Sequence, residues 1–379
     1  SIEGFDIDNI IFAPKNRATI YLYRLIIVDE YSMINDDLYK FLYDNALKFR
    51  VKILFVGDDA QLPPIEKDGH IPKYDDPFLR DIEHYNILTE PARQEPTNPL
   101  LFLLYALRYD IKPSVENFDT FCFYGKKFLG SRWNDFKDSL KLESILSSLK
   151  TAYKLPDVIY SNLYEAVIKQ FPNMVNLATE EGFKHLTNTE FAENLVKEVL
   201  SDDFATDLNH VKCMAFTNKN VGDWNKYVRK IRFPNATDII EVGDLVTSYT
   251  TITYDFQKIF TNSEDYEIVE KEEGTKDVPL VGSSTNKVIT VKGWHTEFKS
   301  LSTGVTTKLF VISPNSLKEF LDAHNYYHSA AKKYKNWREY FAFKRQFCLP
   351  VDLKGLYKNS KNLPTKDMGY GYCITTHKS

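Results

Sequence analysis

The chain has 379 residues, of which 43% are hydrophobic and 26% are charged. This length is typical of two or three domains, with enough apolar material to bury a core. The 24 Tyr and 26 Phe residues, set against 15 Gly, exclude low complexity, collagen-like repeats and wholesale disorder. No apolar run of about 18 residues occurs, so no segment is expected to span a membrane.

The charge is unevenly distributed along the chain. The net charge is −4, yet residues 331–379 contain 11 Lys and Arg against 3 Asp and Glu. Such a basic segment fits a polyanionic partner, or it is simply a solvated helix surface. The four cysteines are widely spaced without a CxxC pattern, which argues against structural zinc or a disulfide framework and favours a reducing compartment.

The first predicted elements are two apolar strands separated by a helix. Leu25–Val28 and Val51–Val56 are short apolar runs that each end at acidic residues. Between them, residues 36–49 have apolar side chains at helical spacing, with Asn35 or Asp36 as the N-cap. Fully apolar strands in this order predict a parallel sheet covered on both faces. The acidic residues then lie at the carboxyl ends of the strands, where open α/β sheets bind ligands.

A second α/β unit is predicted further along the chain. An amphipathic helix at 189–200 precedes an apolar strand at Val211–Phe216, and another helix is expected near 221–231. The preceding residues 113–188 are aromatic and charged without a clear period. We expect them to form a mostly helical connection.

From residue 242 the pattern changes to short alternating strands. They are expected at 244–248, 266–269, 288–291 and 308–312, with turns at 262–265, 272–274 and 282–286. This pattern predicts a small β-barrel inserted in the second α/β unit. The capping-box pattern of Ser316–Glu319 then predicts a long helix that runs to Phe341. A strand at Tyr372–Thr375 closes the chain.

Two segments carry residues suited to nucleotide chemistry. Asp29 and Glu30 follow the first strand, where one carboxylate can hold Mg²⁺ and its neighbour can polarise a water molecule. Such a pair is also common as an ordinary acidic helix start. After the second strand, Gly57 allows a tight exit and Gln61 is placed to sense a phosphate or to orient water. The alternative interpretation of this segment is a Gly-Asp turn with a Pro-rich exit.

Three motifs in order resemble motifs II, III and IV of superfamily 1 helicases. They are Val28-Asp-Glu-Tyr-Ser-Met33, Val56-Gly-Asp-Asp-Ala-Gln-Leu-Pro-Pro64 and Leu88-Thr-Glu-Pro-Ala-Arg-Gln94. Two further segments agree with the family pattern, Ala215-Phe-Thr-Asn-Lys219 and Tyr372-Cys-Ile-Thr-Thr-His-Lys-Ser379, and the latter is similar to the start of motif V. The resemblance is strongest to the 5′→3′ class that includes RecD and the phage helicase Dda. It covers essentially the whole chain except 113–188.

The resemblance implies roles for individual residues. Asp29 would bind Mg²⁺ and Glu30 would be the catalytic base for the attacking water. Gln61 would couple the ATP γ-phosphate to the DNA-binding cleft. Arg93 would reach the same phosphate from the second RecA-like domain, because a guanidinium can bind phosphate oxygens with two donors. The alternative for Arg93 is an ion pair with a neighbouring glutamate, Glu90 or Glu95.

The resemblance also implies contacts with a bound single strand. The residues concerned are Thr217, Asn218, Thr375, Thr376, His377 and Lys378. For these residues, capping of strand or helix ends is the alternative. Proteins that move along a single strand also stack bases on aromatic rings. Trp224, Trp294 and Trp337 are candidates for this role, although core packing is the favoured interpretation for each of them.

Parts of the family pattern are missing from these residues. No GxxxxGK[ST] sequence occurs, whereas the family places this phosphate-binding loop, with motifs Ia and Ib, upstream of Asp29. Motif VI, with a second arginine, would follow Ser379. We therefore expect a chain truncated at both ends that is inactive as a motor by itself, because the loop's amides and Lys cradle the β- and γ-phosphates.

The expected fold class is α/β, with two RecA-like parallel-sheet domains and a small SH3-like β-barrel inserted in the second. The first domain would be incomplete. The expected boundaries are 1–86 for the latter part of the first domain, 87–240 for the start of the second with its helical connection, 241–313 for the barrel, and 314–379 for the remainder of the second domain.

The expected function is that of a fragment of an ATP-dependent DNA helicase that uses ATP and Mg²⁺. Its partners would be single-stranded DNA and duplex junctions, with a single-strand-binding or replication protein as a further candidate. It would act as a monomer in the cytoplasm of a bacterial or phage-infected cell, without a membrane partner.

Two alternatives come from other classes. The first is a non-catalytic nucleic-acid-binding protein with a degenerate ATP site, against which the intact Asp29, Glu30, Gln61 and Arg93 argue. The second is a viral RNA helicase, in which motifs II to IV have a similar form. A helicase–nuclease fusion also stays open, with the nuclease outside this chain.

Overall fold

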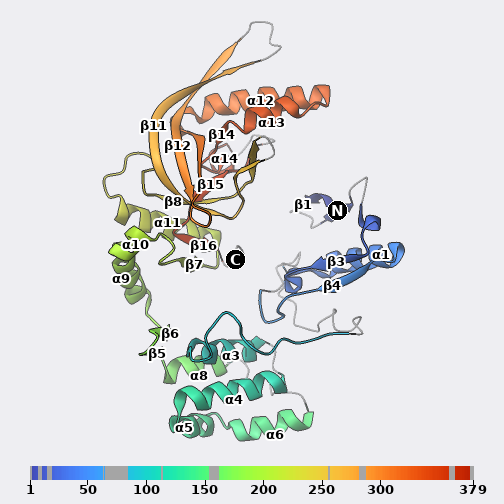
Figure 1. The fold of residues 1–379 in the computed structure, drawn as a ribbon, viewed down its shortest axis with the longest axis vertical. Helices are drawn as coiled ribbons and strands as arrows, with labels where there is room; N and C mark the ends of the chain where they lie inside the picture. The colour runs from blue at the N-terminus through green and yellow to red at the C-terminus, as the bar shows by residue number, and fades with distance from the viewer. Residues whose placement is uncertain are drawn as a thin grey trace. The chain divides into compact units, whose positions relative to one another are not determined.

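The structure is a computed structural model that describes residues 2–6, 11–14, 19–62, 64, 84–111, 114–152, 162–254, 257–280, 287–357 and 363–375. The chain divides into two compact units, Ser1–Leu186 and Thr187–Ser379 (Figure 1). The fold is mixed α/β, and each unit contains a pair of parallel strands. The predicted cover on both faces is wrong for the first pair in the described part of the chain, since Leu25, Ile27 and Leu54 are 48%, 63% and 48% exposed. None of the helices in the described residues is long and apolar enough to cross a membrane. The four expected domain ranges stay predictions.

The N-terminal part of the first unit is built on two parallel strands. β3 (Leu25–Val28) pairs with β4 (Lys52–Phe55), and α1 (Asp36–Phe49) connects them. The Asn35 side chain caps α1 by accepting a hydrogen bond from the Leu38 N–H at 3.0 Å. The predicted strand–helix–strand order is therefore confirmed. Short elements flank it: β1 (Ile2–Asp6), β2 (Ile11–Pro14), and the 3₁₀ turns η1 (Ile20–Leu22) and η2 (Tyr31–Met33).

The rest of the first unit is mainly helical, as expected for residues 113–188. It comprises α3 (Leu100–Ile111), α4 (Val115–Leu129), α5 (Arg132–Ser139), α6 (Leu142–Ala152), α8 (Leu163–Gln170) and the hairpin of β5 (Asn173–Asn176) and β6 (Glu181–Lys184). The aromatic residues of this stretch form its core. Phe102 and Phe121 are fully buried and stack with ring centroids 4.9 Å apart. The ring of Trp133 covers Gly125, where any Cβ would collide with it.

The second unit begins with the predicted helices and a second parallel pair of strands. Its elements are α9 (Asn188–Val199), α10 (Asp202–Thr206), β7 (Cys213–Ala215), α11 (Asn218–Arg232) and β16 (Cys373–Thr375). β7 and β16 pair in parallel, although they come from distant parts of the sequence. Thr187 and Glu190 form a capping box at the start of α9. The order helix, strand, helix was predicted correctly.

The second unit also contains a large sheet. The strands of this region are β8 (Leu245–Ser248), β9 (Ile252–Tyr254), β10 (Gln257–Phe260), β11 (Asp265–Pro279), β12 (Val288–Ser300), β13 (Thr306–Ile312), β14 (Phe347–Cys348) and β15 (Met368–Tyr370). Six of them form one sheet in the order β14-β13-β12-β11-β8-β15, and β9 pairs with β10. Successive residues of β13 face opposite sides, so Phe310 packs toward α12 whereas Val311 packs with Trp294.

This sheet departs from the expected barrel. Its order runs from β14 to β15 without closing in the described residues, so the SH3-like barrel is not confirmed. The turn predicted at Glu272–Gly274 is wrong, because these residues lie inside β11. Gly274 instead allows close packing, since a Cβ there would lie 2.6 Å from the ring of His295. The turn at 262–265 is present, and the one at 282–286 lies outside the described residues.

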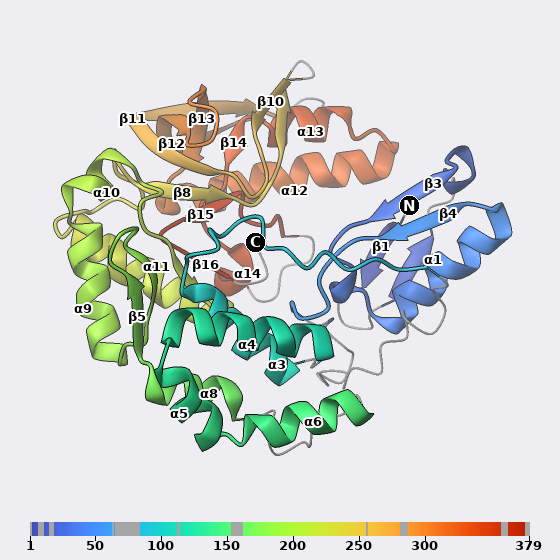
Figure 2. The ribbon, with the colours of Figure 1, turned by 60° about the horizontal axis from the view of Figure 1, so that its bottom comes forward.

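The helices after the sheet also differ from the prediction. They are η3 (Pro314–Ser316), α12 (Leu317–Tyr334), α13 (Arg338–Lys344) and α14 (Leu353–Leu356). The Ser316 hydroxyl does not cap α12, because it accepts a hydrogen bond from the Lys292 N–H at 3.0 Å. The expected long helix is broken at Lys335, whose backbone is left-handed with φ 53°. Figure 2 shows α12 and α13 next to each other beside the sheet.

Candidate functional site

The first candidate residues lie at the carboxyl end of β3. Asp29 and Glu30 are both exposed, and the Asp29 Oδ1 accepts a hydrogen bond from the Glu30 N–H at 3.0 Å. Glu30 has a left-handed backbone, with φ 53° and ψ 47°. For a residue with a Cβ this conformation costs about 1 kcal/mol or more. Strain of this kind is concentrated at functional sites, and no local sequence pattern predicted it here.

The end of β4 lies directly against the end of β3. A Cβ on Gly57 would be 2.8 Å from the Tyr31 nitrogen and 2.9 Å from its ring, so only glycine allows this approach. The Tyr31 N–H donates to the Val56 carbonyl at 3.2 Å, and the Val56 N–H donates to the Val28 carbonyl at 2.8 Å. The two motifs, separated by a helix in the sequence, therefore meet at one end of the sheet. This confirms the predicted adjacency.

The turn after β4 is held by an interaction that the sequence did not reveal. Within the turn, the Gln61 N–H donates to the Asp58 carbonyl at 3.1 Å. Arg108 of α3 binds both acidic residues, with its Nη1 2.8 Å from Asp58 Oδ1 and its Nη2 3.4 Å from Asp59 Oδ1. Burial lowers the pKa of Arg108, but the two carboxylates outweigh it and raise the pKa overall. Arg108 lies 50 residues beyond Asp58, so no local pattern could have indicated this pair.

Two other predicted residues of the nucleotide site have exposed side chains. Gln61 lies in the turn after β4, at the same end of the sheet as Asp29 and Glu30. Arg93 lies in the segment that leads into α3. It forms no ion pair with Glu90 or Glu95, which are described along with it. The structure therefore groups Asp29, Glu30 and Gln61, while the role expected for Arg93 stays a prediction.

The predicted nucleic-acid residues lie at the ends of the second parallel pair. Thr375 of β16 is opposite Ala215 of β7 in the register, which places it beside the segment that leads to Thr217. The Thr217 side chain accepts a hydrogen bond from the Asn220 N–H at 3.2 Å and so caps α11. The capping alternative thus holds for Thr217. Asn218 is exposed at the first position of α11.

The remaining three predicted contacts, Thr376, His377 and Lys378, lie outside the described residues. Of the tryptophans considered for stacking, Trp294 is buried in the core at 5% exposure, whereas Trp337 is 38% exposed. Trp224 is partly buried and packs edge-on against Phe191. Core packing is therefore confirmed for Trp294, and it is wrong as a full description of Trp337.

Buried polar side chains form hydrogen bonds with β16 and with the residue that precedes it. The Asn225 amide donates to the Cys373 carbonyl at 2.8 Å and accepts from the Cys373 N–H at 2.9 Å. Nearby, the fully buried Asp244 accepts hydrogen bonds from Arg229 at 3.1 Å and from the Tyr372 hydroxyl at 2.7 Å. Burial raises the pKa of Asp244 even though Arg229 lowers it. Sequence reasoning missed both groups, because Cys373 lies 148 residues from Asn225 and Tyr372 lies 128 residues from Asp244.

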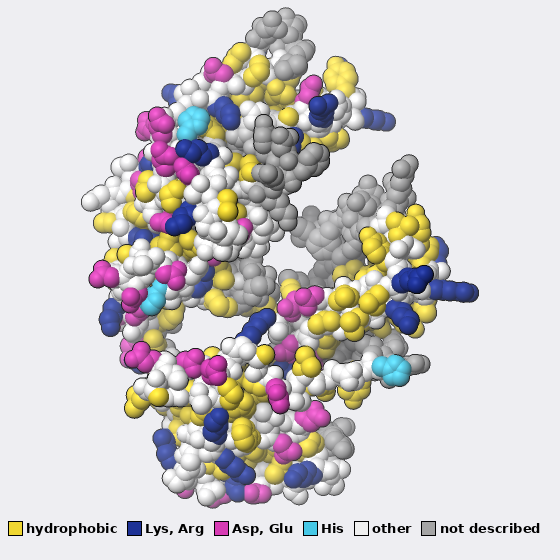
Figure 3. All heavy atoms as spheres, viewed as in Figure 1, with side chains coloured by type: hydrophobic (Ala, Val, Ile, Leu, Met, Phe, Trp, Pro, Cys, Tyr) yellow, Lys and Arg dark blue, Asp and Glu magenta, His cyan; other side chains and the backbone are white. Residues whose placement is uncertain are grey.

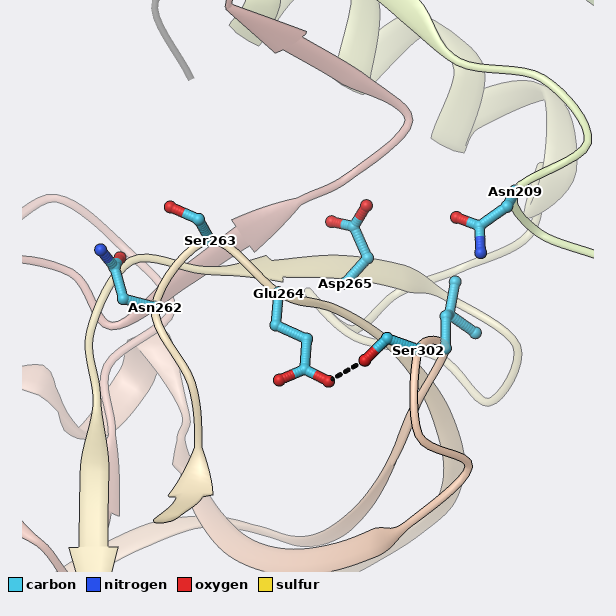
Figure 4. Close-up of a pocket in the computed structure, with 7 residues that line it drawn as sticks. Asn209, Asn262, Ser263, Glu264, Asp265 and Ser302 are labelled. Atoms are coloured by element: carbon cyan, nitrogen blue, oxygen red, sulfur yellow. Dashed lines mark hydrogen bonds between the residues drawn. The ribbon is translucent and has the colours of Figure 1, made fainter. Parts of the chain in front are cut away.

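A pocket of about 410 Å³ opens elsewhere in the second unit (Figure 4). It is lined by Asn209, Asn262, Ser263, Glu264, Asp265, Leu301 and Ser302. Glu264 accepts hydrogen bonds from Ser302 at 2.7 Å and from the Tyr266 hydroxyl at 3.1 Å. Burial raises the pKa of Glu264, but these bonds and one from Ser300 lower it overall. The Glu264 carboxylate thus already has hydrogen-bond partners within the fold. None of the predicted site residues lines this pocket.

Comparison with known proteins adds a family match for the first candidate site. Residues 2–95 match a family model described as an AAA domain. This stretch contains the joined ends of β3 and β4 as well as Arg93, and the match supports an NTP-hydrolysing domain here. No curated protein matches the chain.

One solved structure similar to the chain is that of the Pif1 helicase from Candida albicans. The two are 13% identical, with a TM-score of 0.33, and the match covers 75% of this chain and 54% of that one. The chain thus spans about half the length of the Pif1 chain in that structure.

Proposed function

We propose that this chain is part of an ATP-dependent superfamily 1 DNA helicase of the 5′→3′ class, which couples ATP hydrolysis to movement along single-stranded DNA and to duplex unwinding. The observation that carries the proposal is the junction of two motifs at Gly57. There the Asp29–Glu30 pair and the turn containing Gln61 share the ligand-binding end of a parallel sheet. The AAA-domain match includes all of these residues.

The residues at this end suit ATP hydrolysis. Asp29 would hold Mg²⁺, because carboxylate oxygens are its preferred protein ligands and the Glu30 N–H already fixes this carboxylate. When bound, Mg²⁺ would neutralise charge on the phosphate oxygens. Glu30 would orient the attacking water and accept its proton, and Gln61 would contact the γ-phosphate. Arg93 would stabilise the negative charge of the transferred phosphoryl group.

The second parallel pair would contribute to the strand-binding surface. Thr217, Asn218 and Thr375 lie at or next to its carboxyl end, where hydroxyl and amide groups can hold the phosphates of a single strand. The same role is proposed for the segment 376–378 that follows. In this proposal the protein works as a monomer on single-stranded DNA and at duplex junctions.

The test is ATP hydrolysis by the protein as its gene encodes it, with and without single-stranded DNA. Glu30→Gln removes the proposed base but keeps the size of the side chain. We expect hydrolysis to fall about 100-fold or more while ATP binding persists. Asp44→Asn is the matched control, because Asp44 is an exposed acid on α1, and its hydrolysis should equal that of the wild type.

The possible outcomes separate the proposal from its alternatives. Wild-type hydrolysis by Glu30→Gln would contradict the assigned base. Stimulation by RNA but not by DNA would favour the viral RNA helicase. Binding of nucleic acid without any hydrolysis of ATP would favour the non-catalytic binding protein.

A further inference from the structure

The junction of α12 and α13 exposes an unusual group of aromatic side chains. Every residue from 332 to 339 is exposed. Tyr334, Trp337 and Phe341 have 69%, 38% and 53% of their surface accessible. Single exposed apolar residues are normal, but three large rings within eight positions form a patch that calls for a partner. We refer to residues 332–345 as the aromatic–basic elbow.

The backbone of the elbow explains why the rings face outward. α12 ends at Tyr334, and Lys335 turns the chain with its left-handed backbone before α13 begins at Arg338. The predicted continuous helix would have kept Phe341 near the face of the buried Phe320 and Tyr327. After the break, Trp337 is 38% and Phe341 is 53% exposed, and neither ring belongs to that core in the described residues.

The rings of the elbow are held in place by their neighbours. Trp337 meets the edges of His328 and Tyr340, each with ring centroids 5.5 Å away. Phe341 lies beside Trp337 at 6.2 Å. Tyr340 is fixed in turn, because its hydroxyl lies 3.0 Å from the Nε2 of the buried His324. Rings that are already ordered lose little entropy when a ligand binds.

The charge around these rings is strongly positive. Residues 331–346 contain six Lys and Arg and a single acid, Glu339. Lys344 is neutralised within the fold by Asp367 at 2.6 Å, and Lys333 lies 5.1 Å from the Tyr334 ring. Figure 3 shows Lys and Arg side chains among hydrophobic ones at this end of α12. The positive charge of this surface suits an anion, and its exposed rings suit a ligand that also has flat apolar faces.

We propose that the aromatic–basic elbow binds single-stranded nucleic acid, with bases stacked on Trp337 and Phe341 and phosphates bound by Lys335 and Arg338. A duplex keeps its bases stacked on one another, whereas a single strand can place them on protein rings. The choice of nucleic acid as the anion rests on the proposed function. The contact itself is additional to the residues at the ends of β7 and β16.

The first experiment tests stacking. It measures the affinity of the 379-residue chain for a fluorescein-labelled oligo(dT) of about 20 nucleotides by anisotropy, without nucleotide. The double variant Trp337→Ala/Phe341→Ala should bind about tenfold more weakly or worse. Trp337→Phe should retain most of the affinity, because it keeps a stacking ring. Phe123→Ala is the matched control, since Phe123 is a 59% exposed ring on α4, and it should bind as the wild type does.

The second experiment tests the phosphate contacts. Lys335→Glu/Arg338→Glu should weaken binding and reduce the slope of log K against log salt by about 1.4, since each phosphate contact to a single strand contributes about 0.7. Lys318→Glu changes an exposed charge in the first turn of α12 and should leave the slope unchanged. Circular dichroism of each variant verifies the fold.

Several results would overturn the inference. Wild-type affinity in Trp337→Ala/Phe341→Ala would do so and would leave the helicase proposal intact, because that proposal is tested by hydrolysis in Glu30→Gln. Tight binding of labelled poly-glutamate that oligo(dT) cannot displace would also overturn it, and it would indicate an acidic protein partner. A wild-type chain that binds no oligo(dT) would refute the elbow contact even if hydrolysis is observed.

Discussion

Each unit contains a two-stranded parallel sheet, β3–β4 in the first and β7–β16 in the second, and the two pairs differ in how they are covered. In the first pair, one side is open, with Leu25 48%, Ile27 63% and Leu54 48% exposed. In the second pair, Cys213 and Cys373 are only 3% and 1% exposed and belong to a core with α9 and α11. The chemistry-bearing residues of the first pair are correspondingly exposed, whereas Thr375 of the second is 9% exposed.

The polar side chains of the two pairs accordingly have different roles. Behind β16, Asn225 is buried and bonds only to backbone groups, so it serves stability. At the end of β3, the Asp29 and Glu30 carboxylates face solvent, so they are accessible to a ligand. Substitution of the buried Asn225 should therefore act mainly on folding, and substitution of the exposed Asp29 or Glu30 mainly on activity.

The largest effect is expected at Asn225. Asn225→Ala leaves the N–H and carbonyl of Cys373 without partners inside the core, which should reduce the free energy of unfolding of the second unit by about 3 kcal/mol. Urea denaturation measures this loss. Asn220→Ala is the control on the same helix, because the Asn220 side chain is exposed. Equal midpoints for both variants would show that water or a backbone shift replaces the lost bonds.

A smaller effect is expected at Gly57, and it tests whether any contact of the first pair is structurally essential. Gly57→Ala places a Cβ against the Tyr31 backbone, so the strand ends must separate, at a cost of about 2 kcal/mol. Hydrogen exchange at the Tyr31 and Val56 amides should accelerate, because they join the two strand ends. Gly222→Ala meets no atom within 4 Å and should be neutral or stabilising. Unchanged exchange at Tyr31 would contradict the close approach.

The smallest effect depends on pH and concerns His324. Burial lowers the pKa of His324 to about 4, with smaller contributions from Asn325, which raises it, and from His328 and Lys344, which lower it. The unfolded chain takes up this proton near pH 6.5, so the stabilising contribution is complete above pH 6.5 and is lost as the pH falls toward 4.

The change should amount to about 1 to 2 kcal/mol after allowance for solvent screening. Unfolding midpoints measured from pH 7 to 4 should show it, and His324→Phe should flatten this dependence. His210→Gln should retain it, because His210 is an exposed residue beside Glu198. An identical pH profile in His324→Phe would mean that other groups cause the acid sensitivity.

Local patterns predicted the elements on which the candidate site is built. Apolar strands and helical spacing are short-range signals, so β3, α1, β4 and the Asn35 cap could be predicted before any tertiary contact was known. The acidic residues followed from the same reasoning, since they come directly after a strand. The strand predicted at Tyr372–Thr375 is present as β16, whereas its parallel pairing with β7 was not predicted.

What could not be predicted depends on contacts between distant residues. Gly274 reads locally as a turn residue, but it lies within β11 because Gly293 is opposite and the His295 ring covers it. The Ser316 pattern fits a capping box, yet its hydroxyl bonds to the distant Lys292. For the same reason, neither the ion pairs of Arg108 nor the exposure of Trp337 could be predicted. Each outcome is decided by tertiary packing, which overrides local propensity.

The left-handed backbone at Glu30 has a consequence for the evolution of such a protein. Replacing Glu30 by glycine would remove both the proposed base and the conformational strain, so the mutant would gain stability in the same step in which it lost hydrolysis. A single codon change could therefore yield a well-folded descendant that lacks the proposed hydrolysis. Only selection for the proposed hydrolysis would keep glutamate at this position.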